Sequence, residues 1–148
     1  MEAKYFEDFR LGEVFRSPAR TITDTHFTLF ATITGDAHPI HYDDEYAKRT
    51  IFGRRVAHGL LVTSMGALGA SPLSPLVEES MVAFLEQSSR FLRPVFVGDA
   101  LSPELEVVER VPKGDRGLLR LRITIRNQRG ETVLEGHHLY LIRRRPAA

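Results

Sequence analysis

The sequence predicts an α+β protein in which a curved antiparallel β-sheet of about five strands wraps around one long central helix. Two observations predict this class. Four β-rich stretches follow one another in residues 81–143 and are separated only by short turns, and strands joined by short turns pair antiparallel. Residues 58–70 read HGLLVTSMGALGA and carry no Asp, Glu, Lys or Arg, so we expect a helix that the rest of the protein covers on most sides.

The N-terminal quarter predicts one short strand and one helix. Residues 13–21 contain a short β-rich run, which predicts the strand. Thr23 or Asp24 can cap the helix that follows, because their side-chain oxygens accept hydrogen bonds from the first free N–H groups. Gly35 is placed to end this helix in a left-handed conformation.

The later strands are expected from their period-two alternation of apolar and polar residues. They cover residues 81–93, 101–111, 118–127 and 132–143. In the third of them Arg120, Arg122 and Arg126 alternate with Leu and Ile, which is typical of a strand with one buried and one solvated face. These arginines belong to a basic final third that could instead meet phosphate, but the alternation favours a solvated strand face.

The composition is that of one folded domain. The chain has 148 residues, of which 43% are hydrophobic, enough for one core and hardly enough for two. We therefore expect a single domain over residues 1–148, with residues 144–148 as a loose tail. Lys plus Arg number 20 and Asp plus Glu number 19, a net charge of +1, which argues against nucleic-acid binding through bulk positive charge.

The chain contains no cysteine. This excludes disulfides, thiolate nucleophiles and zinc–thiolate or iron–sulfur sites, and it favours a cytoplasmic protein. No run approaches the roughly 18 apolar residues that a membrane span requires, and the charged first ten residues lack the apolar core of a signal peptide. We therefore expect no membrane partner, and chemistry that uses His, Asp, Glu, Ser or Tyr.

The segment after the first helix holds two ionisable groups in a stiffened loop. Gly35 ends the helix, and Pro39 forces His38 into an extended conformation. The chain between Asp36 and His41 is thereby held in a defined turn. A carboxylate and an imidazole at this spacing can reach opposite sides of one water molecule, which is the arrangement needed to remove one proton while delivering another.

Several runs of the sequence resemble one known family. Residues 34–41 read TGDAHPIH, with Ala47 after five further residues, and this run resembles the hydratase signature of the MaoC-like dehydratases, the (R)-specific enoyl-CoA hydratases. Residues 52–61 (FGRRVAHGLL) are similar to the segment that leads into the family's central helix, and residues 5–12 and 94–99 also resemble family features. The resemblance implies the hotdog fold, a sheet wrapped around a long helix, as a homodimer or a dimer of dimers.

The resemblance also implies an activity, the reversible hydration of a trans-2-enoyl thioester to a 3-hydroxyacyl thioester, with coenzyme A or an acyl carrier protein as the thiol. Asp36 and His41 would be the catalytic pair, and no cofactor is expected. Gly59 begins the expected central helix, where free N–H groups and the helix dipole can stabilise an enolate oxygen. The family usually has Asn where this chain has His38.

Other polar residues near these motifs have more than one interpretation. His38 can orient the loop or line the pocket, and His58 can bond the helix start, support the loop or contact substrate. Ser64 can contact substrate or bond its own helical turn. Arg54 and Arg55 can meet a coenzyme A phosphate or remain solvated.

A metal site and two other functions are alternatives to the hydratase activity. Asp36, His38 and His41 supply three potential ligands, the number that a catalytic zinc site requires, but their spacing fits no zinc motif and HExxH is absent, so we expect no metal. A hotdog thioesterase could use the same oxyanion site at Gly59. A non-catalytic acyl-thioester-binding subunit could keep the same fold. We also expect a dimer, because the sheet would otherwise leave an edge strand open.

Overall fold

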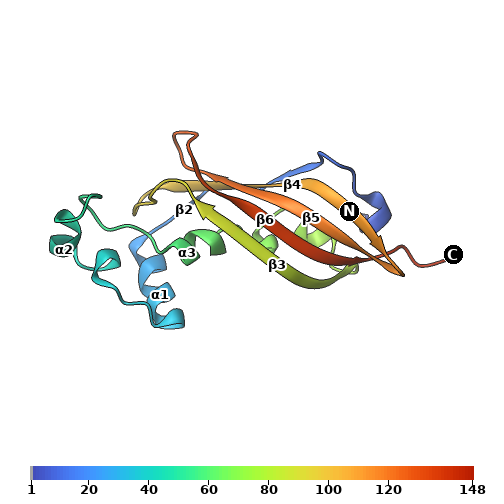
Figure 1. The fold of residues 1–148 in the computed structure, drawn as a ribbon, viewed down its shortest axis with the longest axis horizontal. Coiled ribbons are helices and arrows are strands. Elements are labelled where there is room, and N and C mark those ends of the chain that lie inside the picture. Colours follow the sequence, from blue (N-terminus) through green and yellow to red (C-terminus); the bar gives the residue numbers. More distant parts are fainter. Residues whose placement is uncertain (1) are drawn as a thin grey trace.

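A six-stranded antiparallel sheet forms the centre of the computed structural model, which describes residues 2–148 and confirms the α+β class (Figure 1). The strand order is β1-β4-β5-β6-β3, and β2 pairs with β4 beside this path. The strands are β1 (Val14–Arg16), β2 (Arg20–Thr21), β3 (Met81–Phe91), β4 (Ala100–Lys113), β5 (Arg116–Arg126) and β6 (Thr132–Arg143). The four long strands agree with the sequence-based bounds to within two residues at each end.

Short helices accompany the sheet in residues 2–148. The α-helices are α1 (Asp24–Thr34), α2 (Asp44–Lys48) and α3 (Gly59–Ser64), and the 3₁₀-helices are η1 (Phe6–Asp8), η2 (Pro39–His41), η3 (Leu68–Ala70) and η4 (Ser74–Leu76). Thr23 precedes α1, and its backbone N–H donates to Nδ1 of His26 at 2.7 Å. Gly35 ends α1 with φ of 77°, as predicted. No helix in the described residues is long and apolar enough to span a membrane.

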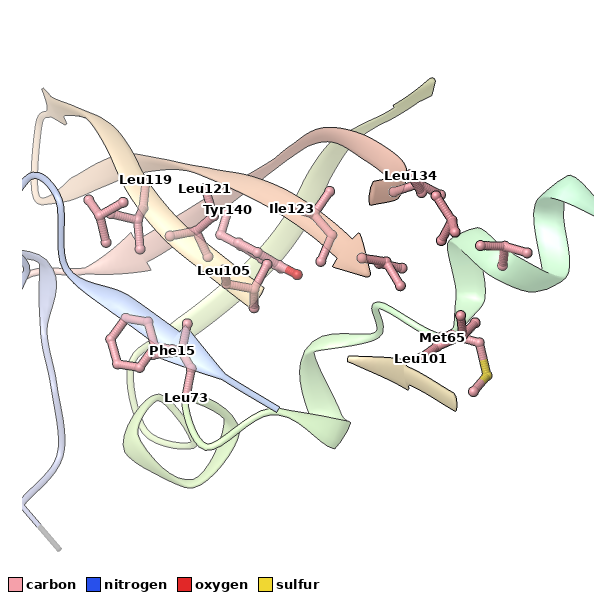
Figure 2. Close-up of a cluster of buried hydrophobic side chains, with 14 of the residues drawn as sticks. Phe15, Met65, Leu73, Leu101, Leu105, Leu119, Leu121, Ile123, Leu134 and Tyr140 are labelled. Carbon is pink, nitrogen blue, oxygen red and sulfur yellow. The ribbon is translucent and has the colours of Figure 1, made fainter. Parts of the chain in front are cut away.

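The core lies between one face of the sheet and the segment that follows α3. The alternation in β5 places Leu119, Leu121 and Ile123 in this core, each at most 1% exposed. Met65 and Leu73 belong to the same buried cluster and approach it from the chain after α3 (Figure 2). Complete burial of such a side chain stabilises the fold by about 1.5–3 kcal/mol.

The outer face of the sheet carries the arginines of the basic final third. Arg122 lies 3.3 Å from a carboxylate oxygen of Glu106 on the neighbouring strand, and Arg126 lies 3.9 Å from Glu104. These residues stand opposite or diagonal to one another across β4 and β5. The arginines therefore form a solvated strand face with cross-strand ion pairs, as the alternation indicated.

The central helix is shorter than expected. The sequence predicts a helix over residues 58–70, but α3 ends at Ser64 and the chain continues through a turn into η3. Gly66 costs about 1 kcal/mol in a helix relative to Ala, and a Cβ at this position would lie only 3.1 Å from Cδ1 of Ile123 on the sheet. The helix is also not covered on all sides, because Leu60 is 65% exposed.

Two segments near the chain ends also differ from the expectation. The strand expected over residues 13–21 is divided into β1 and β2, with Pro18 between them, because proline has no N–H to continue a ladder. The loose tail expected over residues 144–148 is anchored in part. Arg144 and Arg145 form ion pairs of 3.0 and 2.6 Å with the two acidic residues of η1.

Strand β3 is an open edge of the sheet. One side of β3 pairs with β6 along its whole length, and no strand within residues 2–148 pairs with the other side. Phe84 and Leu85 in this strand are 54% and 46% exposed. An edge with unpaired backbone groups and exposed apolar side chains favours pairing with another strand.

Candidate active site

The loop after α1 brings Asp36 and His41 together. Gly35 turns the chain away from α1, and Pro39 starts η2, which contains His41. The His41 residue is 9% exposed, whereas half of the Asp36 side chain is exposed, and the Oδ2 atom of Asp36 lies 4.0 Å from Nε2 of His41. This separation is too long for a direct hydrogen bond, and it is one that a water bonded to both atoms can bridge.

The hydrogen bonds around this pair fix which atoms are free. Nδ1 of His41 lies 2.7 Å from the carbonyl oxygen of Val56, and because a carbonyl only accepts, we assign the ring proton to Nδ1. Nε2 of His41 then has a free lone pair that faces Asp36. Oδ1 of Asp36 accepts the N–H of His38 at 3.3 Å, which leaves Oδ2 for the water.

His58 lies behind this pair rather than in the solvent. It is 3% exposed, and its ring stacks on that of His41 with centroids 3.7 Å apart and an angle of 22°. Nε2 of His58 lies 2.8 Å from the hydroxyl of Tyr42 and 3.2 Å from the carbonyl oxygen of Asp36. Burial lowers the pKa of His58 below its usual value. The structure therefore brings His58 to the loop that holds Asp36 and His41 and not to an open surface.

Tyr42 is the residue of this site that the sequence reasoning missed. Its hydroxyl lies 2.9 Å from the carbonyl oxygen of Phe27 and 3.1 Å from that of Asp36. Burial, together with the charge of Asp36, raises the pKa of Tyr42, so this hydroxyl stays protonated near neutral pH. The sequence shows only that a tyrosine directly follows His41. This position predicts no role for Tyr42 until the places of α1 and of the loop are known.

His38 caps η2. Its Nδ1 accepts the backbone N–H of Ile40 at 3.2 Å, and its ring packs edge-on to Tyr46 with centroids 5.7 Å apart. Nδ1 of histidine is as many bonds from Cα as Oδ1 of asparagine. His38 can therefore accept the hydrogen bond that an Asn at this position could accept.

Gly59 and Ser64 lie on α3. The N–H of Gly59 is in the first turn and has no acceptor inside the helix, and a Cβ on Gly59 would lie 3.0 Å from the ring of Phe91. Gly59 and Phe91 also line an apolar pocket of about 400 Å³. Ser64 is exposed, and its hydroxyl donates to the carbonyl oxygen of Leu60 in its own helical turn at 2.7 Å. Ser64 thus makes the local bond that was the alternative to substrate contact.

The two arginines before α3 bind within the protein. Nη1 and Nε of Arg55 lie 2.6 and 2.9 Å from carboxylate oxygens of Asp24 and Asp44. The hydrogen bond to Asp24 and the charges of both acids raise the pKa of Arg55. Arg54 stacks over the ring of Phe96 at 3.8 Å. Arg55 therefore joins the start of α1 to α2 rather than facing a ligand.

The residues that could hold a metal are Asp36, His41 and His58, with ligand atoms within 4.8 Å of one another. His38, the third candidate from sequence, is not among them. A metal about 2.1 Å from a ring nitrogen lies in the plane of that ring, but the rings of His41 and His58 are stacked, so their in-plane lone pairs do not converge. The geometry favours acid–base chemistry over a metal site.

The wrapped sheet and the Asp36–His41 pair together define a hotdog-fold enzyme. Residues 8–123 match the family model described as "MaoC like domain". The chain therefore belongs to the MaoC-like dehydratase family, as the resemblance of its motifs indicated.

Two curated relatives have named activities. The 3-hydroxybutyryl-CoA dehydratase of Methylorubrum extorquens is 32% identical over 146 residues, which cover 97% of this chain and 87% of the relative. The (R)-specific enoyl-CoA hydratase of Rhodospirillum rubrum is 32% identical over 138 residues, which cover 93% of this chain and 91% of the relative.

Solved structures share the fold. The monoamine oxidase regulatory protein from Archaeoglobus fulgidus has a TM-score of 0.91 and 38% identity, over 99% of this chain and 98% of that one. A protein from Mycobacterium tuberculosis described as having a double hotdog fold has a TM-score of 0.83 and 27% identity, over 99% of this chain and 46% of that one. The predicted hotdog fold is therefore confirmed.

Proposed function

We propose that this protein catalyses the reversible hydration of a trans-2-enoyl-CoA to a 3-hydroxyacyl-CoA, with Asp36 and His41 as the catalytic residues. The observation that carries the proposal is the 4.0 Å gap between Oδ2 of Asp36 and Nε2 of His41, with both atoms free to accept protons from one water. The two relatives named as a 3-hydroxybutyryl-CoA dehydratase and an (R)-specific enoyl-CoA hydratase support the thioester class.

The two acceptors give the water a defined orientation. The water donates one hydrogen to Asp36 and the other to Nε2 of His41, so that its oxygen lone pair is free to attack C3 of the substrate. As the C3–O bond forms, Nε2 takes the proton, and the electron pair of the C2=C3 bond moves toward the thioester carbonyl. The imidazolium then returns this proton to C2. Acid–base assistance of this kind contributes about 10²–10⁴-fold to the rate.

The enolate oxygen requires a hydrogen-bond donor, and the N–H of Gly59 supplies it in this proposal. Because α3 has only six residues, the helix dipole contributes less than a long central helix would, and the free N–H carries more of the stabilisation. Removal of one oxyanion donor costs about 2.7–4 kcal/mol of transition-state stabilisation. The ring of Phe91 lies where it would be 3.0 Å from a Cβ on Gly59, and both residues line the apolar pocket beside this N–H.

The protein is proposed to work as a homodimer, alone or paired into a dimer of dimers, in the cytoplasm. The open edge of β3 and its exposed apolar residues support self-association. A chain without cysteine needs no oxidising compartment. Neither a nucleic acid nor a membrane is part of the proposal.

Incubation of the purified protein with crotonyl-CoA tests the proposal. We expect the enoyl absorbance to fall without release of free thiol. Thiol release without hydration would instead identify a thioesterase. Thermal stabilisation by a series of acyl-CoAs without turnover would identify a non-catalytic binding subunit. The same assay with crotonyl-pantetheine bound to an acyl carrier protein distinguishes the two thiol carriers.

A further inference from the structure

We infer that Tyr42 and His58 act as a pair of positioning residues that hold Asp36 and His41 at the separation needed to bind one water. The inference rests on the proposed hydration and adds residues that touch neither the water nor the substrate. It concerns a hydrogen-bonded and stacked cluster that joins α1, the loop after it and the start of α3.

The first observation is how the main chain at Asp36 is held. The Asp36 side chain is half exposed, and its only hydrogen bond found within residues 2–148 is the one from the N–H of His38 to Oδ1. Two polar side-chain atoms lie near its carbonyl oxygen, the hydroxyl oxygen of Tyr42 at 3.1 Å and Nε2 of His58 at 3.2 Å. The N–H of Asp36 donates to Oγ1 of Thr34 at 3.2 Å, so Tyr42 and His58 hold the carbonyl side of this peptide.

The second observation is where the protons of the cluster lie. Nδ1 of His58 is buried without a hydrogen-bond partner in the described residues. A proton on this atom would be a buried donor without an acceptor, which costs more free energy than a lone pair without a donor. The ring proton of His58 is therefore assigned to Nε2, from which it is donated to the hydroxyl oxygen of Tyr42 at 2.8 Å and toward the carbonyl oxygen of Asp36 at 3.2 Å. The hydroxyl of Tyr42 then donates to the carbonyl oxygen of Phe27, so both carbonyl groups are satisfied.

The third observation is the stack on His41. One face of the His58 ring lies 3.7 Å from the His41 ring at 22°, while Phe30 and Phe27 of α1 pack against it with centroids 4.8 and 5.9 Å away. His58 thus connects the apolar side of α1 to the catalytic imidazole. Together with the bond from Nδ1 of His41 to Val56, the stack keeps Nε2 of His41 aimed at Asp36.

The charges around His58 require it to be neutral for this role. The titratable groups that face it are the hydroxyl of Tyr42 through a hydrogen bond, the imidazole of His41 through the stack and the nearby carboxylate of Asp36 through its charge, and its neighbours from α1 are phenylalanines. When His41 takes the proton of the water, a neutral ring tolerates the new cation against its face. A charged His58 would repel it. Burial keeps the pKa of His58 low, which agrees with this requirement.

Three variants test the inference by steady-state kinetics with crotonyl-CoA. Tyr42→Phe removes one hydroxyl, His58→Leu removes the donor and the ring, and His58→Gln returns an amide N–H as many bonds from Cα as Nε2. A displacement of about 1 Å in such a site can cost about 10²-fold, so we expect Tyr42→Phe and His58→Leu to lower kcat by about 10-fold or more at unchanged KM. His58→Gln is expected to recover at least about threefold over His58→Leu, because it keeps the donor.

The matched control is Tyr46→Phe, which removes a tyrosine hydroxyl of α2 for which no hydrogen bond is found within residues 2–148. It is expected to keep the wild-type kcat. Thermal unfolding and circular dichroism identify the folded variants, and kcat is compared only among these. A Tyr42→Phe enzyme that is folded and keeps kcat within twofold of wild type would overturn the inference, as would equal kcat values for His58→Gln and His58→Leu.

A spectroscopic readout separates this inference from the proposed function. Long-range ¹H–¹⁵N NMR of the wild-type imidazoles at pH 7 is expected to find neutral His58 with its proton on Nε2 and neutral His41 with its proton on Nδ1. A charged His58, or one with its proton on Nδ1, would overturn the inference even in an active enzyme. If the wild-type protein has the expected tautomer at both His58 and His41 but does not hydrate crotonyl-CoA, the proposed function is refuted, and the positioning role with it.

Discussion

Nε2 of His41 and Oδ2 of Asp36 face each other across 4.0 Å although the two residues lie on opposite sides of a proline. The bond of Nδ1 to Val56 leaves Nε2 of His41 as the acceptor. The pair has one open side, because half of the Asp36 side chain is exposed, and water can enter there. The other side is closed, because His41 is buried, and this fixes the imidazole.

Asp36→Asn and His41→Ala are expected to lower kcat by at least about 10²-fold, which is the range for acid–base groups. Asn keeps the oxygen that accepts the N–H of His38, so the turn should survive in the first variant while the negative charge is lost. Steady-state kinetics with crotonyl-CoA measure the loss, and thermal unfolding checks the fold. Turnover at the wild-type rate in either variant would place the chemistry elsewhere.

His38→Asn is expected to keep both activity and stability, because Oδ1 of Asn can accept the N–H of Ile40 that Nδ1 of His38 accepts at 3.2 Å. His38→Ala removes this acceptor and is expected to lower the free energy of unfolding by about 0.5–1.5 kcal/mol. Urea unfolding and kcat are measured for both variants. Equal loss of activity in the two would mean that the imidazole itself takes part in the reaction.

Arg55→Gln is expected to change KM by the same factor for crotonyl-CoA and for crotonyl-pantetheine. The second substrate lacks the nucleotide phosphates. The reason is that the guanidinium already binds Asp24 and Asp44 at 2.6 and 2.9 Å. The lost ion pairs, which are partly exposed, should lower the free energy of unfolding by about 1 kcal/mol or less. Arg54→Gln is the control. An increase in KM for the coenzyme A substrate alone in Arg55→Gln would show that Arg55 binds phosphate.

The sheet and the loop from Gly35 to His41 were predictable because their signals are local. Period-two alternation defines the strands of residues 81–143, and Gly35 and Pro39 mark the turn that contains Asp36 and His41. The length of the central helix was not predictable in this way. Nothing within residues 58–70 reveals that Ile123 lies against Gly66, and this approach of the sheet accompanies the end of α3.

The contacts of Tyr42 were hidden from sequence reasoning. The hydroxyl of Tyr42 bonds a backbone carbonyl 15 residues earlier and a ring nitrogen 16 residues later. Backbone carbonyls exist at every position, so no residue type marks the partner. For His58 the sequence left both support of the loop and contact with substrate open, and its burial at 3% exposure favours support of the loop.

A mass of twice the chain mass, or of four times for a dimer of dimers, is expected in sedimentation equilibrium or light scattering, because β3 leaves an open edge with Phe84 and Leu85 exposed. Leu85→Lys is expected to weaken the dimer, since charged side chains at an edge oppose strand pairing. Leu11→Lys, at a 67% exposed position of the N-terminal segment, is the control and should stay dimeric. A monomer mass at all concentrations would contradict the proposed dimer.

His138 is expected to make the protein less stable as the pH falls. It is 3% exposed, and burial lowers its pKa to about 4, below the value of about 6.5 for an unfolded chain. The unfolded state therefore binds more protons between these two values, and the free energy of unfolding decreases as the pH falls through this window. The stability is fully present above about pH 6.5 and has fallen by about 3 kcal/mol below pH 4.

His138→Asn isolates this contribution, because Oδ1 of Asn can take the place of Nδ1, which lies 3.0 Å from the hydroxyl of Tyr140, but does not titrate. The variant loses volume, and its stability at pH 7 is expected to be lower. The quantity that decides is the slope of the unfolding free energy against pH from urea titrations between pH 7 and pH 4. The carboxylates that also titrate there are common to both proteins, so a shallower slope in the variant assigns the difference to His138. Equal slopes would contradict the lowered pKa of His138 and mean that its protonation in the folded state carries no cost.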